Sequence, residues 1–198
     1  KKAIETGADL VMASDPDADR IGTAIRDKEG NFILVNGNQT MLICLYYLMT
    51  RRDELQLLTG KEYVVKTIVT TESVRNIAED FGVELLHVLT GFKYIGEYMT
   101  DMSKRGVLGD FVFAFEESCG YLAGAHVRDK DGVVASMLIA EMCAEYRRRG
   151  MTLIDRLNWL YHKFGRHHHK QVTYRFTPAG QEKTATGMIV QDQKSFSI

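Results

Sequence analysis

The sequence of residues 63–115, YVVKTIVTTESVRNIAEDFGVELLHVLTGFKYIGEYMTDMSKRGVLGDFVFAF, alternates short apolar segments with segments of helical length. The apolar segments are rich in β-branched or aromatic residues, as strands are, and they cover residues 63–69, 83–88 and 111–115. Between them, helices are predicted over about 72–82, with Thr71 as the cap and Gly82 as the stop, and over about 92–104. Strands that alternate with helices favour an α/β layer structure with a mainly parallel sheet.

The same alternation continues on both sides of this stretch. Before it, the sequence predicts the end of a helix at 1–6, a strand at 10–13, a hairpin of 21–26 and 32–35, and a helix over about 40–50 capped by Thr40. After it, the sequence predicts helices over about 132–149 and 152–165, a strand at 171–176 and a helix start at Thr177-Pro178. The predicted fold class is α/β, a mainly parallel or mixed sheet flanked by helices, with partial neighbouring domains.

Length and charge exclude several classes of protein. The chain has 198 residues, and its 25 Lys plus Arg almost balance its 26 Asp plus Glu. The formal charge of −1 gives no electrostatic case for a nucleic-acid partner, and the apolar stretch 41–49 is far shorter than the ~20 residues of a membrane-spanning helix. Cys44, Cys119 and Cys143 form no Cys-x-x-Cys pair, so reduced thiols and a cytoplasmic location are expected.

Residues 15–20, Asp-Pro-Asp-Ala-Asp-Arg, place three carboxylates at alternate positions directly after a predicted buried strand. Loops in this position usually bind the ligands of open α/β sheets. Neighbouring carboxylates on a straight strand would be about 6.6 Å apart, so the loop must curl before Asp15, Asp17 and Asp19 share one ion. A hard cation such as Mg²⁺ would offset their repulsion, and Arg20 suits either a phosphate or a structural counterion role.

Two other interpretations apply to this acidic loop. An EF-hand has the same alternating acids, but it requires glycine at its sixth position and glutamate at its twelfth, where this sequence has Arg20 and Arg26. A solvated acidic turn, in which Asp side chains accept bonds from nearby backbone amides, is the second interpretation. The residues exclude the EF-hand and leave the turn open beside the metal site.

Three more motifs lie where predicted strands meet turns or helices. Residues 116–121, Glu-Glu-Ser-Cys-Gly-Tyr, follow an aromatic strand, and adjacent acids there suit sugar hydroxyls or else an ordinary exposed turn. Residues 90–93, Thr-Gly-Phe-Lys, open a helix whose amides and dipole favour an anion. Residues 128–132, Arg-Asp-Lys-Asp-Gly, open another helix, and from local sequence a solvated face is a more common interpretation of such a charged entry than a ligand site.

Together with Gly37-Asn38-Gln39-Thr40, these motifs occur in an order that resembles the α-D-phosphohexomutases, the phosphoglucomutase and phosphomannomutase family. The resemblance covers about residues 7–165. It implies that residues 1–31 end a metal-loop domain 2 and that 32–161 form a sugar-recognition domain 3. It further implies that 162–198 are a linker and the start of a C-terminal domain 4, so the partners of this chain include missing domains of the same parent.

The resemblance also implies roles for single residues, with Mg²⁺ as the cofactor. It implies metal binding by Asp15, Asp17 and Asp19, catalysis by Arg20 and Lys130, and substrate binding by Thr90, Gly91, Glu116 and Ser118. The ligands it implies are a hexose phosphate and a hexose bisphosphate.

In that family, phosphate moves between O1 and O6 of a hexose through a bisphosphorylated sugar and an enzyme phosphoserine, and this isomerase activity is expected of the full-length parent. The 198 residues contain no loop resembling Thr-Ala-Ser-His-Asn-Pro or Arg-x-Ser-Gly-Thr, so the chain alone is expected to be inactive. A non-catalytic sugar-phosphate binding module and a metal-dependent phosphatase that forms an aspartyl phosphate stay open as alternatives. The motifs do not distinguish glucose from mannose or pentose phosphate.

Overall fold

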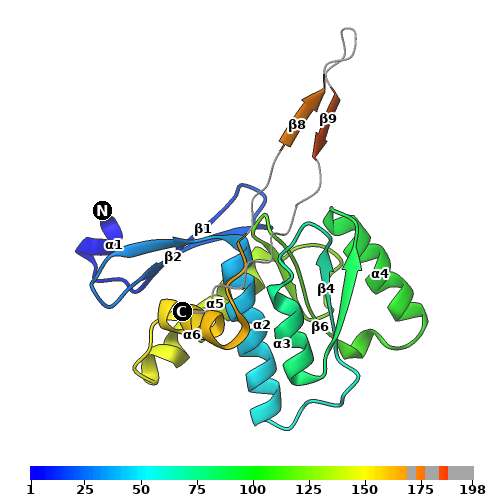
Figure 1. The fold of residues 1–198 in the computed structure, drawn as a ribbon, viewed down its shortest axis with the longest axis horizontal. Coiled ribbons are helices and arrows are strands. Elements are labelled where there is room, and N and C mark those ends of the chain that lie inside the picture. The colour runs from blue at the N-terminus through cyan, green and yellow to red at the C-terminus, as the bar shows by residue number, and fades with distance from the viewer. Residues whose placement is uncertain (169–172, 177–182, 187–198) are drawn as a thin grey trace.

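The computed structural model describes residues 1–168, 173–176 and 183–186 of the chain (Figure 1). Its elements are α1 (Lys2–Glu5), β1 (Leu10–Ser14), β2 (Ile21–Arg26), β3 (Phe32–Val35), α2 (Gly37–Glu54), β4 (Tyr63–Thr67), α3 (Ser73–Phe81), β5 (Glu84–Val88), α4 (Phe92–Lys104), the 3₁₀ turn η1 (Leu108–Asp110), β6 (Phe111–Glu116), β7 (Gly120–Ala123), α5 (Gly132–Arg148), α6 (Leu153–Phe164), β8 (Thr173–Phe176) and β9 (Lys183–Thr186). The predicted helix start at Thr177-Pro178 lies outside the described residues.

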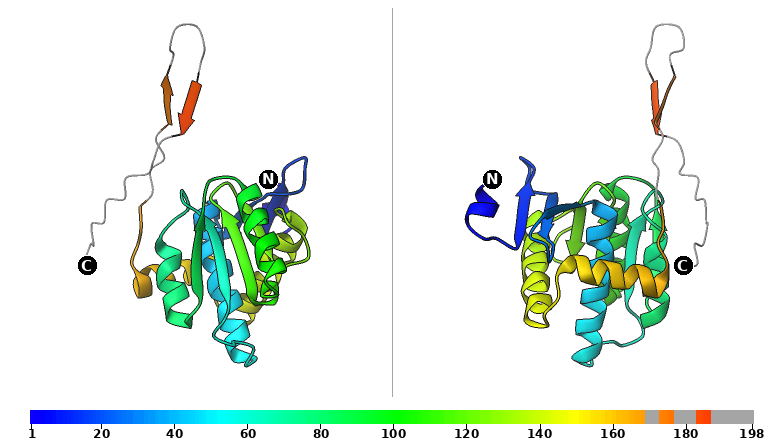
Figure 2. Two further views of the ribbon diagram at one scale, coloured as in Figure 1. Left: turned by 90° about the vertical axis from the view of Figure 1, so that its right-hand side faces the viewer. Right: turned by 60° about the vertical axis from the view of Figure 1, so that its left-hand side comes forward.

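A four-stranded sheet in the order β5-β4-β6-β7 is the centre of the fold. β5, β4 and β6 run parallel, and β7 joins the edge antiparallel to β6. Every residue of β4 and β6 is buried, as expected for parallel strands that helices cover on both faces. α4 covers one face, while α2, α3 and α5 contribute to the apolar cluster on the other (Figure 2). The predicted α/β class, with a mixed sheet flanked by helices, is confirmed.

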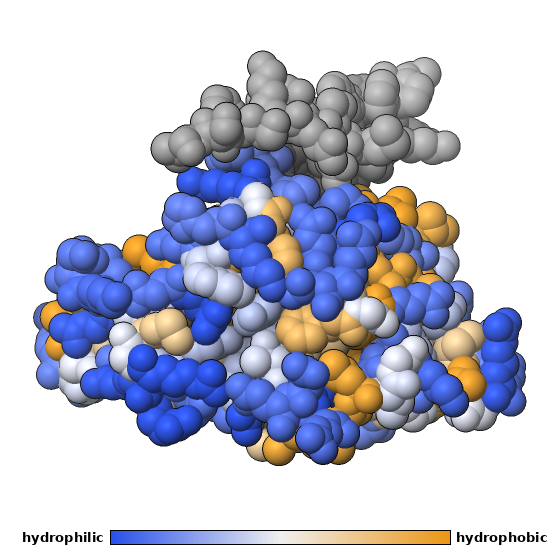
Figure 3. Space-filling model, turned by 60° about the horizontal axis from the view of Figure 1, so that its bottom comes forward, coloured by the Kyte–Doolittle hydropathy of each residue, from blue (hydrophilic) through white to orange (hydrophobic). Residues whose placement is uncertain are grey.

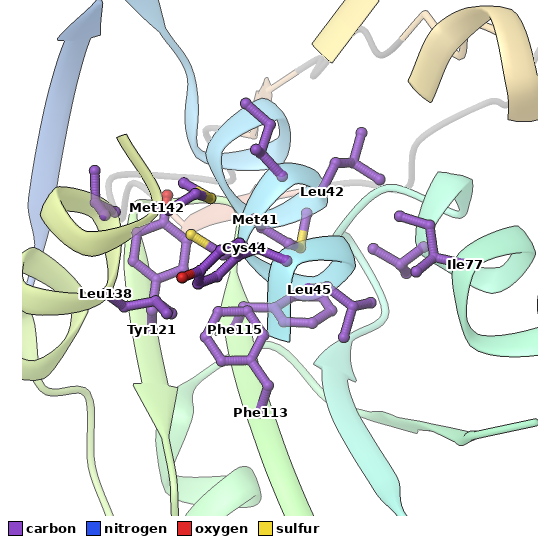
Figure 4. Packing of buried hydrophobic residues seen from close by; sticks show 14 of the residues in the cluster. Met41, Leu42, Cys44, Leu45, Ile77, Phe113, Phe115, Tyr121, Leu138 and Met142 are labelled. Atoms are coloured by element: carbon purple, nitrogen blue, oxygen red, sulfur yellow. The ribbon is translucent and has the colours of Figure 1, made fainter. Parts of the chain in front are cut away.

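The larger core lies between this sheet and α2. Phe113 and Phe115 of β6 and Tyr121 of β7 point toward the helix, where Cys44 and Leu45 meet them (Figure 4). α2 also contacts α3, α5 and α6, so it is apolar over most of its circumference, as a helix buried on several sides must be. The apolar stretch noted in the sequence is therefore a core helix.

A second sheet, in the order β1-β2-β3, is antiparallel throughout. Ile21 and Ile25 on the inner face of β2 are buried in the same apolar cluster as α2. The two sheets join where Ile21 N–H donates a 3.1 Å hydrogen bond to Cys119 O, and where Arg20 and Gly120 form a β-bridge. This junction places the loop after β1 beside the turn between β6 and β7.

Several element boundaries differ from the prediction by a few residues, and two of these differences have a clear physical cause. α2 begins at Gly37, and Thr40 does not cap it, because Asn36 and Gln39 form a capping box upstream of Thr40. Their side chains accept hydrogen bonds of 3.0 and 3.1 Å from each other's backbone N–H. Gly120, which we interpreted as part of a loop, starts β7, because the antiparallel ladder with β6 begins at its pairing with Glu116.

The surface and the thiols give further limits. No helix in the described part of the chain has the length and apolar character needed to cross a membrane. Polar residues cover most of the face in Figure 3, and hydrophobic residues appear on it as separate groups. Cys44, Cys119 and Cys143 are free thiols, and Cys44 is buried.

Candidate active site

Glu116 ends β6 and is 7% exposed. Its Oε1 accepts a 3.0 Å hydrogen bond from Gly91 N–H, at the N-terminus of α4. Burial raises the pKa of Glu116 above its ordinary value, although the Gly91 bond and nearby Lys130 oppose this rise. A buried acid of this kind is costly as core material and suitable as an acceptor for a ligand hydroxyl.

Residues 15–20, which we call the metal loop after the prediction, form a turn between β1 and β2. Ala18 has a φ of 56°, which is rare for a residue other than glycine. Asp15 Oδ2 accepts a 2.6 Å hydrogen bond from Arg20 Nε, and this bond holds the pKa of Asp15 below its ordinary value. The same bond raises the pKa of Arg20. The loop is thus held in part by a pair between one of its acids and its own arginine.

Lys130 connects the metal loop with the other motifs. Its Nζ lies 3.0 Å from Asp19 Oδ2, 3.1 Å from Asp129 Oδ1 and 5.3 Å from the ring centre of Phe92. Only 15% of its side chain is exposed. Burial opposes the charge of Lys130, but the bonds to Asp19 and Asp129 outweigh burial and raise its pKa. The ammonium group therefore remains charged between the acidic loops.

Two glycines allow these loops to touch. A Cβ on Gly120 would overlap the Lys130 side chain, and a Cβ on Gly132 would lie 2.5 Å from Ala18 O. Gly132 N–H also donates a 3.1 Å hydrogen bond to that oxygen. The start of α5 and the metal loop are therefore in backbone contact, and Lys130 lies directly against the turn after β6.

The structure brings six of the predicted site residues to neighbouring loops, and we call these residues the loop cluster. Its members are Asp15, Asp19, Arg20, Gly91, Glu116 and Lys130. Ion pairs join Asp15, Arg20, Asp19 and Lys130, while Gly91 N–H bonds Glu116. The two groups meet at Gly120, which pairs with Glu116 and lies against Lys130. Asp17, Thr90 and Ser118 are exposed on the same loops. Within the described residues, no hydrogen bond joins their side chains to the loop cluster.

Two residues near the loop cluster lie inside the motifs quoted from the sequence, but neither was given a role of its own. Asp131 caps α5, since its Oδ1 accepts 2.9 Å hydrogen bonds from Val133 N–H and Val134 N–H, and it directly follows Lys130 in the chain. An Asp before a predicted helix is a recognisable cap signal, so this residue could have been found. Phe92, whose ring lies under the Lys130 ammonium, carries no such local signal.

The metal loop fits a hard cation in its donor chemistry, because its carboxylate oxygens are the ligands that Mg²⁺ prefers. Asp19 Oδ1 is buried and has no hydrogen-bond partner among the described residues, so it has an unused capacity for a ligand. However, no three His, Cys, Asp or Glu side chains in the described ranges are grouped to hold an ion. Asp15 and Asp19 are paired with Arg20 and Lys130, and a cation would have to replace these contacts.

An open cavity of about 470 Å³ lies along α4 and next to the loop that precedes α5. Its lining residues are Lys93, Gly96, Glu97, Thr100, Asp101, Lys104 and Arg128. None of the nine predicted site residues lines it. The cavity mixes positive and negative side chains and lies outside the loop cluster, so we do not place the ligand there.

A family model agrees with this combination of fold and motifs. The model of phosphoglucomutase/phosphomannomutase, alpha/beta/alpha domain III, matches residues 36–164, which is more than half of the chain. The chain belongs to the phosphoglucomutase/phosphomannomutase family. The matched residues contain the central sheet and α2 to α6, whereas the metal loop precedes them.

Individual members of the family give the same result. The phosphoglucomutase of Staphylococcus aureus strain USA300 is 37% identical over 165 residues, which are 83% of this chain and 29% of that protein. The putative phosphomannomutase from Thermus thermophilus has a TM-score of 0.63 at 22% identity, over 85% of this chain and 35% of the other. Aspergillus fumigatus N-acetylphosphoglucosamine mutase, solved with GlcNAc-6P and magnesium, has a TM-score of 0.58 at 15% identity, over 83% and 34%. The solved structures show the shared fold, and this chain spans less than a third of the curated relative's length.

Proposed function

We propose that this chain supplies the metal loop and the sugar-recognition loops of a phosphohexomutase, an isomerase that moves a phosphoryl group between O1 and O6 of a hexose phosphate. The observation that supports this function most directly is the loop cluster, in which Arg20 and Lys130 both contact Asp19 and Lys130 packs on Gly120, the strand partner of Glu116. A hexose phosphate presents hydroxyl donors and an anion. The loop cluster offers a carboxylate acceptor and two cations to match them.

Sugar hydroxyls are the proposed ligands of residues 116–120, which we call the recognition turn, and of Thr90 and Gly91. Glu116 is held by Gly91 N–H in a buried setting, where hydrogen bonds to a ligand are stronger than in water. Ser118 is exposed beside it and offers both a donor and an acceptor. Such groups would bind hydroxyls of a hexose bisphosphate in either of its two orientations.

Phosphate binding is assigned to Arg20 and Lys130. Asp15 occupies Nε of Arg20, so the terminal guanidinium nitrogens remain for an anion, and the side chain is about half exposed. Mg²⁺, held by Asp15, Asp17 and Asp19, would stabilise negative charge on the transferring phosphoryl group when bound. Lys130 adds a second fixed positive charge on the side of the recognition turn.

The complete reaction belongs to a longer parent in this proposal. The chain spans 29% of the Staphylococcus aureus relative, and its sequence has no loop like the phosphoserine loop of the family. The division into residues 1–31, 32–161 and 162–198 stays a prediction. We expect the chain alone to be inactive, with the hexose phosphate, the hexose bisphosphate and the remaining domains of the parent as its partners.

Mutase assays of the full-length parent test this function. Asp17→Asn and Glu116→Gln should each lower kcat/KM for glucose 1-phosphate at least about 100-fold, because each removes a group that acts on developing charge or on substrate position. Asp53→Asn is the matched control, since Asp53 is exposed on α2 and outside the loop cluster. This control should retain full activity.

The parent should be assayed on a panel of hexose and pentose 1-phosphates. A parent that moves phosphate on none of them would overturn the proposal. Covalent phosphate on Asp15 or Asp17 would favour the phosphatase alternative. Tight binding of hexose phosphate without turnover in the parent would favour the non-catalytic binding module.

A further inference from the structure

Lys66 is a fully buried lysine on β4, next to the centre of the four-stranded sheet. Its Nζ lies 2.8 Å from Thr70 O, 3.5 Å from Thr67 O and 2.6 Å from Glu72 Oε1. Burial lowers the pKa of Lys66, and the bond to Glu72 opposes this shift. All three acceptors lie in residues 67–72, so the buried ammonium fixes the connection between β4 and α3.

This connection in turn holds Glu117. The hydroxyl oxygens of Thr67 and Thr70 lie 2.7 Å apart, and they lie 3.4 and 3.3 Å from Glu117 Oε2. Each hydroxyl has one proton, so one threonine donates to the other and the second donates to Glu117. Both threonines are buried, so this hydrogen bond anchors one oxygen of the half-buried Glu117 carboxylate to the end of β4.

Glu117 lies between Glu116 and Ser118 in the recognition turn, but its side chain binds a different element. Glu116 accepts a hydrogen bond from Gly91 N–H at the start of α4, whereas Glu117 accepts one from the Thr67–Thr70 pair at the end of β4. The backbone carbonyl of Glu117 also packs so closely on Gly37 that a Cβ at that glycine would overlap it. The recognition turn is therefore in contact with the start of α4, the end of β4 and the start of α2.

The contact between Glu117 and the Thr67–Thr70 pair joins two neighbouring strands of the central sheet. The chain leaves β4 through α3 on one face of the sheet and reaches β6 through α4 on the other. At their carboxyl ends, β4 continues toward α3 and β6 continues into the turn before β7, so the chain departs in different directions from these two neighbouring strands. The hydrogen bond from the Thr67–Thr70 pair to Glu117 joins the segments that follow these two strands.

We propose that Lys66, Thr70 and Glu117 are positioning residues for Glu116. A buried ion pair is weak evidence for stability by itself, because apolar replacements are often as stable, so a lysine in the sheet interior calls for another role. The Lys66 ammonium fixes the position of Thr70 through its hydrogen bond to Thr70 O. The Thr67–Thr70 pair then fixes the Glu117 side chain, and Glu117 in turn fixes the backbone of the recognition turn, so that the Glu116 carboxylate stays at Gly91 N–H. The role of Glu116 as a sugar ligand rests on the proposed function. The positioning of Glu116 by Lys66, Thr70 and Glu117 rests only on the contacts described above.

Amide hydrogen exchange at Gly91 tests the proposal in the 198-residue chain, because that amide donates directly to Glu116. Thr70→Val removes the hydroxyl at similar volume and should speed Gly91 exchange about fivefold, the factor expected for loss of one ordinary hydrogen bond. Thr70→Ser keeps a hydroxyl and should restore the wild-type rate. Thr23→Val is the matched control, because Thr23 is equally buried and its hydroxyl pairs with Thr40 instead.

An unchanged Gly91 rate in Thr70→Val, or a raised rate that Thr70→Ser does not restore, would overturn the proposal. Equal acceleration at all amides would also overturn it, because that pattern reports a general loss of stability. Lys66→Met is a second variant and should accelerate Gly91 in the same local way. If Gly91 responds as expected but Thr70→Val leaves glucose 6-phosphate affinity of the parent unchanged, the positioning stands and the sugar role of Glu116 fails.

Discussion

At Glu116, folding favours the neutral acid, whereas the proposed binding of sugar hydroxyls favours the charged carboxylate. Its carboxylate is buried, and burial raises its pKa. The folded state therefore binds the proton of Glu116 more tightly than the unfolded chain does. As the pH rises through the ordinary glutamate range, folding loses stability, and the loss persists at neutral pH. A charge kept at such a cost is typical of a binding site.

Glu116→Gln should therefore stabilise the chain at pH 7, because the amide carries no charge to bury and still offers an oxygen to Gly91 N–H. The gain should shrink as the pH is lowered toward about 3, below the ordinary glutamate pKa of about 4.3, where the wild-type carboxyl is protonated in both states. Urea unfolding at several pH values measures both effects. Glu97→Gln, on the exposed side of α4, is the control and should show no such trend. A loss of stability in Glu116→Gln at pH 7 would contradict this account.

Among the elements, α5 and the metal loop are in direct backbone contact, because Gly132 N–H donates a hydrogen bond to Ala18 O. A change of side-chain rotamer cannot relieve a clash at this contact. Gly132→Ala would place a Cβ 2.5 Å from Ala18 O, so either the loop or the first turn of α5 must move. We expect a stability loss of about 1–3 kcal/mol in urea unfolding of the chain. A shift of the loop by about 1 Å should also lower kcat/KM of the parent about 100-fold.

Gly109→Ala is the matched control for Gly132→Ala, because nothing lies within 4 Å of a Cβ built on Gly109. Its stability should stay within about 0.5 kcal/mol of the wild type. If Gly132→Ala changed neither the free energy of unfolding nor kcat/KM of the parent, the close contact between α5 and the metal loop would be unimportant for stability and activity.

The types and order of the elements were predictable because caps, stops and apolar periods are local. α4, β2 and β3 begin and end at the predicted residues. The start of α2 was wrong because two cap signals compete there, and Asn36 with Gln39 satisfies more backbone groups than Thr40 does. β7 was missed because its turn needs Cys119 at a φ of 67°, a conformation that the residue type does not signal.

The candidate site was predictable as a set of loops but not as a set of contacts. The positions of the motifs at the ends of strands follow from local pattern, and so does the adjacency of Arg20 to the acids. The pairing of Lys130 with Asp19 does not, because it depends on how the two sheets join at Ile21 and Cys119. The opposed bonding of Glu116 and Glu117 also depends on tertiary packing that no single-sequence pattern encodes. The roles of all nine site residues remain predictions.

For the whole molecule, the decisive feature is that both sheets share one apolar core. Ile21, Ile25 and Val35 of the antiparallel sheet belong to the same cluster as the side chains around α2 and β6. α6 contacts both α2 and β2, so it packs on elements from each side of the junction. The loop cluster lies at that junction, and its geometry therefore depends on the two sheets folding together.

Trp159, the single tryptophan of the chain, allows this dependence to be measured. It lies on α6, so its fluorescence reports unfolding of the core around α2. Ile25→Ala, in the other sheet, should lower the free energy of unfolding seen by Trp159 by about 2–4 kcal/mol, because Ile25 is 3% exposed. Leu34→Ala, at 78% exposure, should shift the same transition by less than about 0.5 kcal/mol. If Ile25→Ala left the unfolding transition seen by Trp159 unchanged, the two sheets would unfold separately. The loop cluster, which lies where the sheets join, would then not be held in one geometry by a shared core.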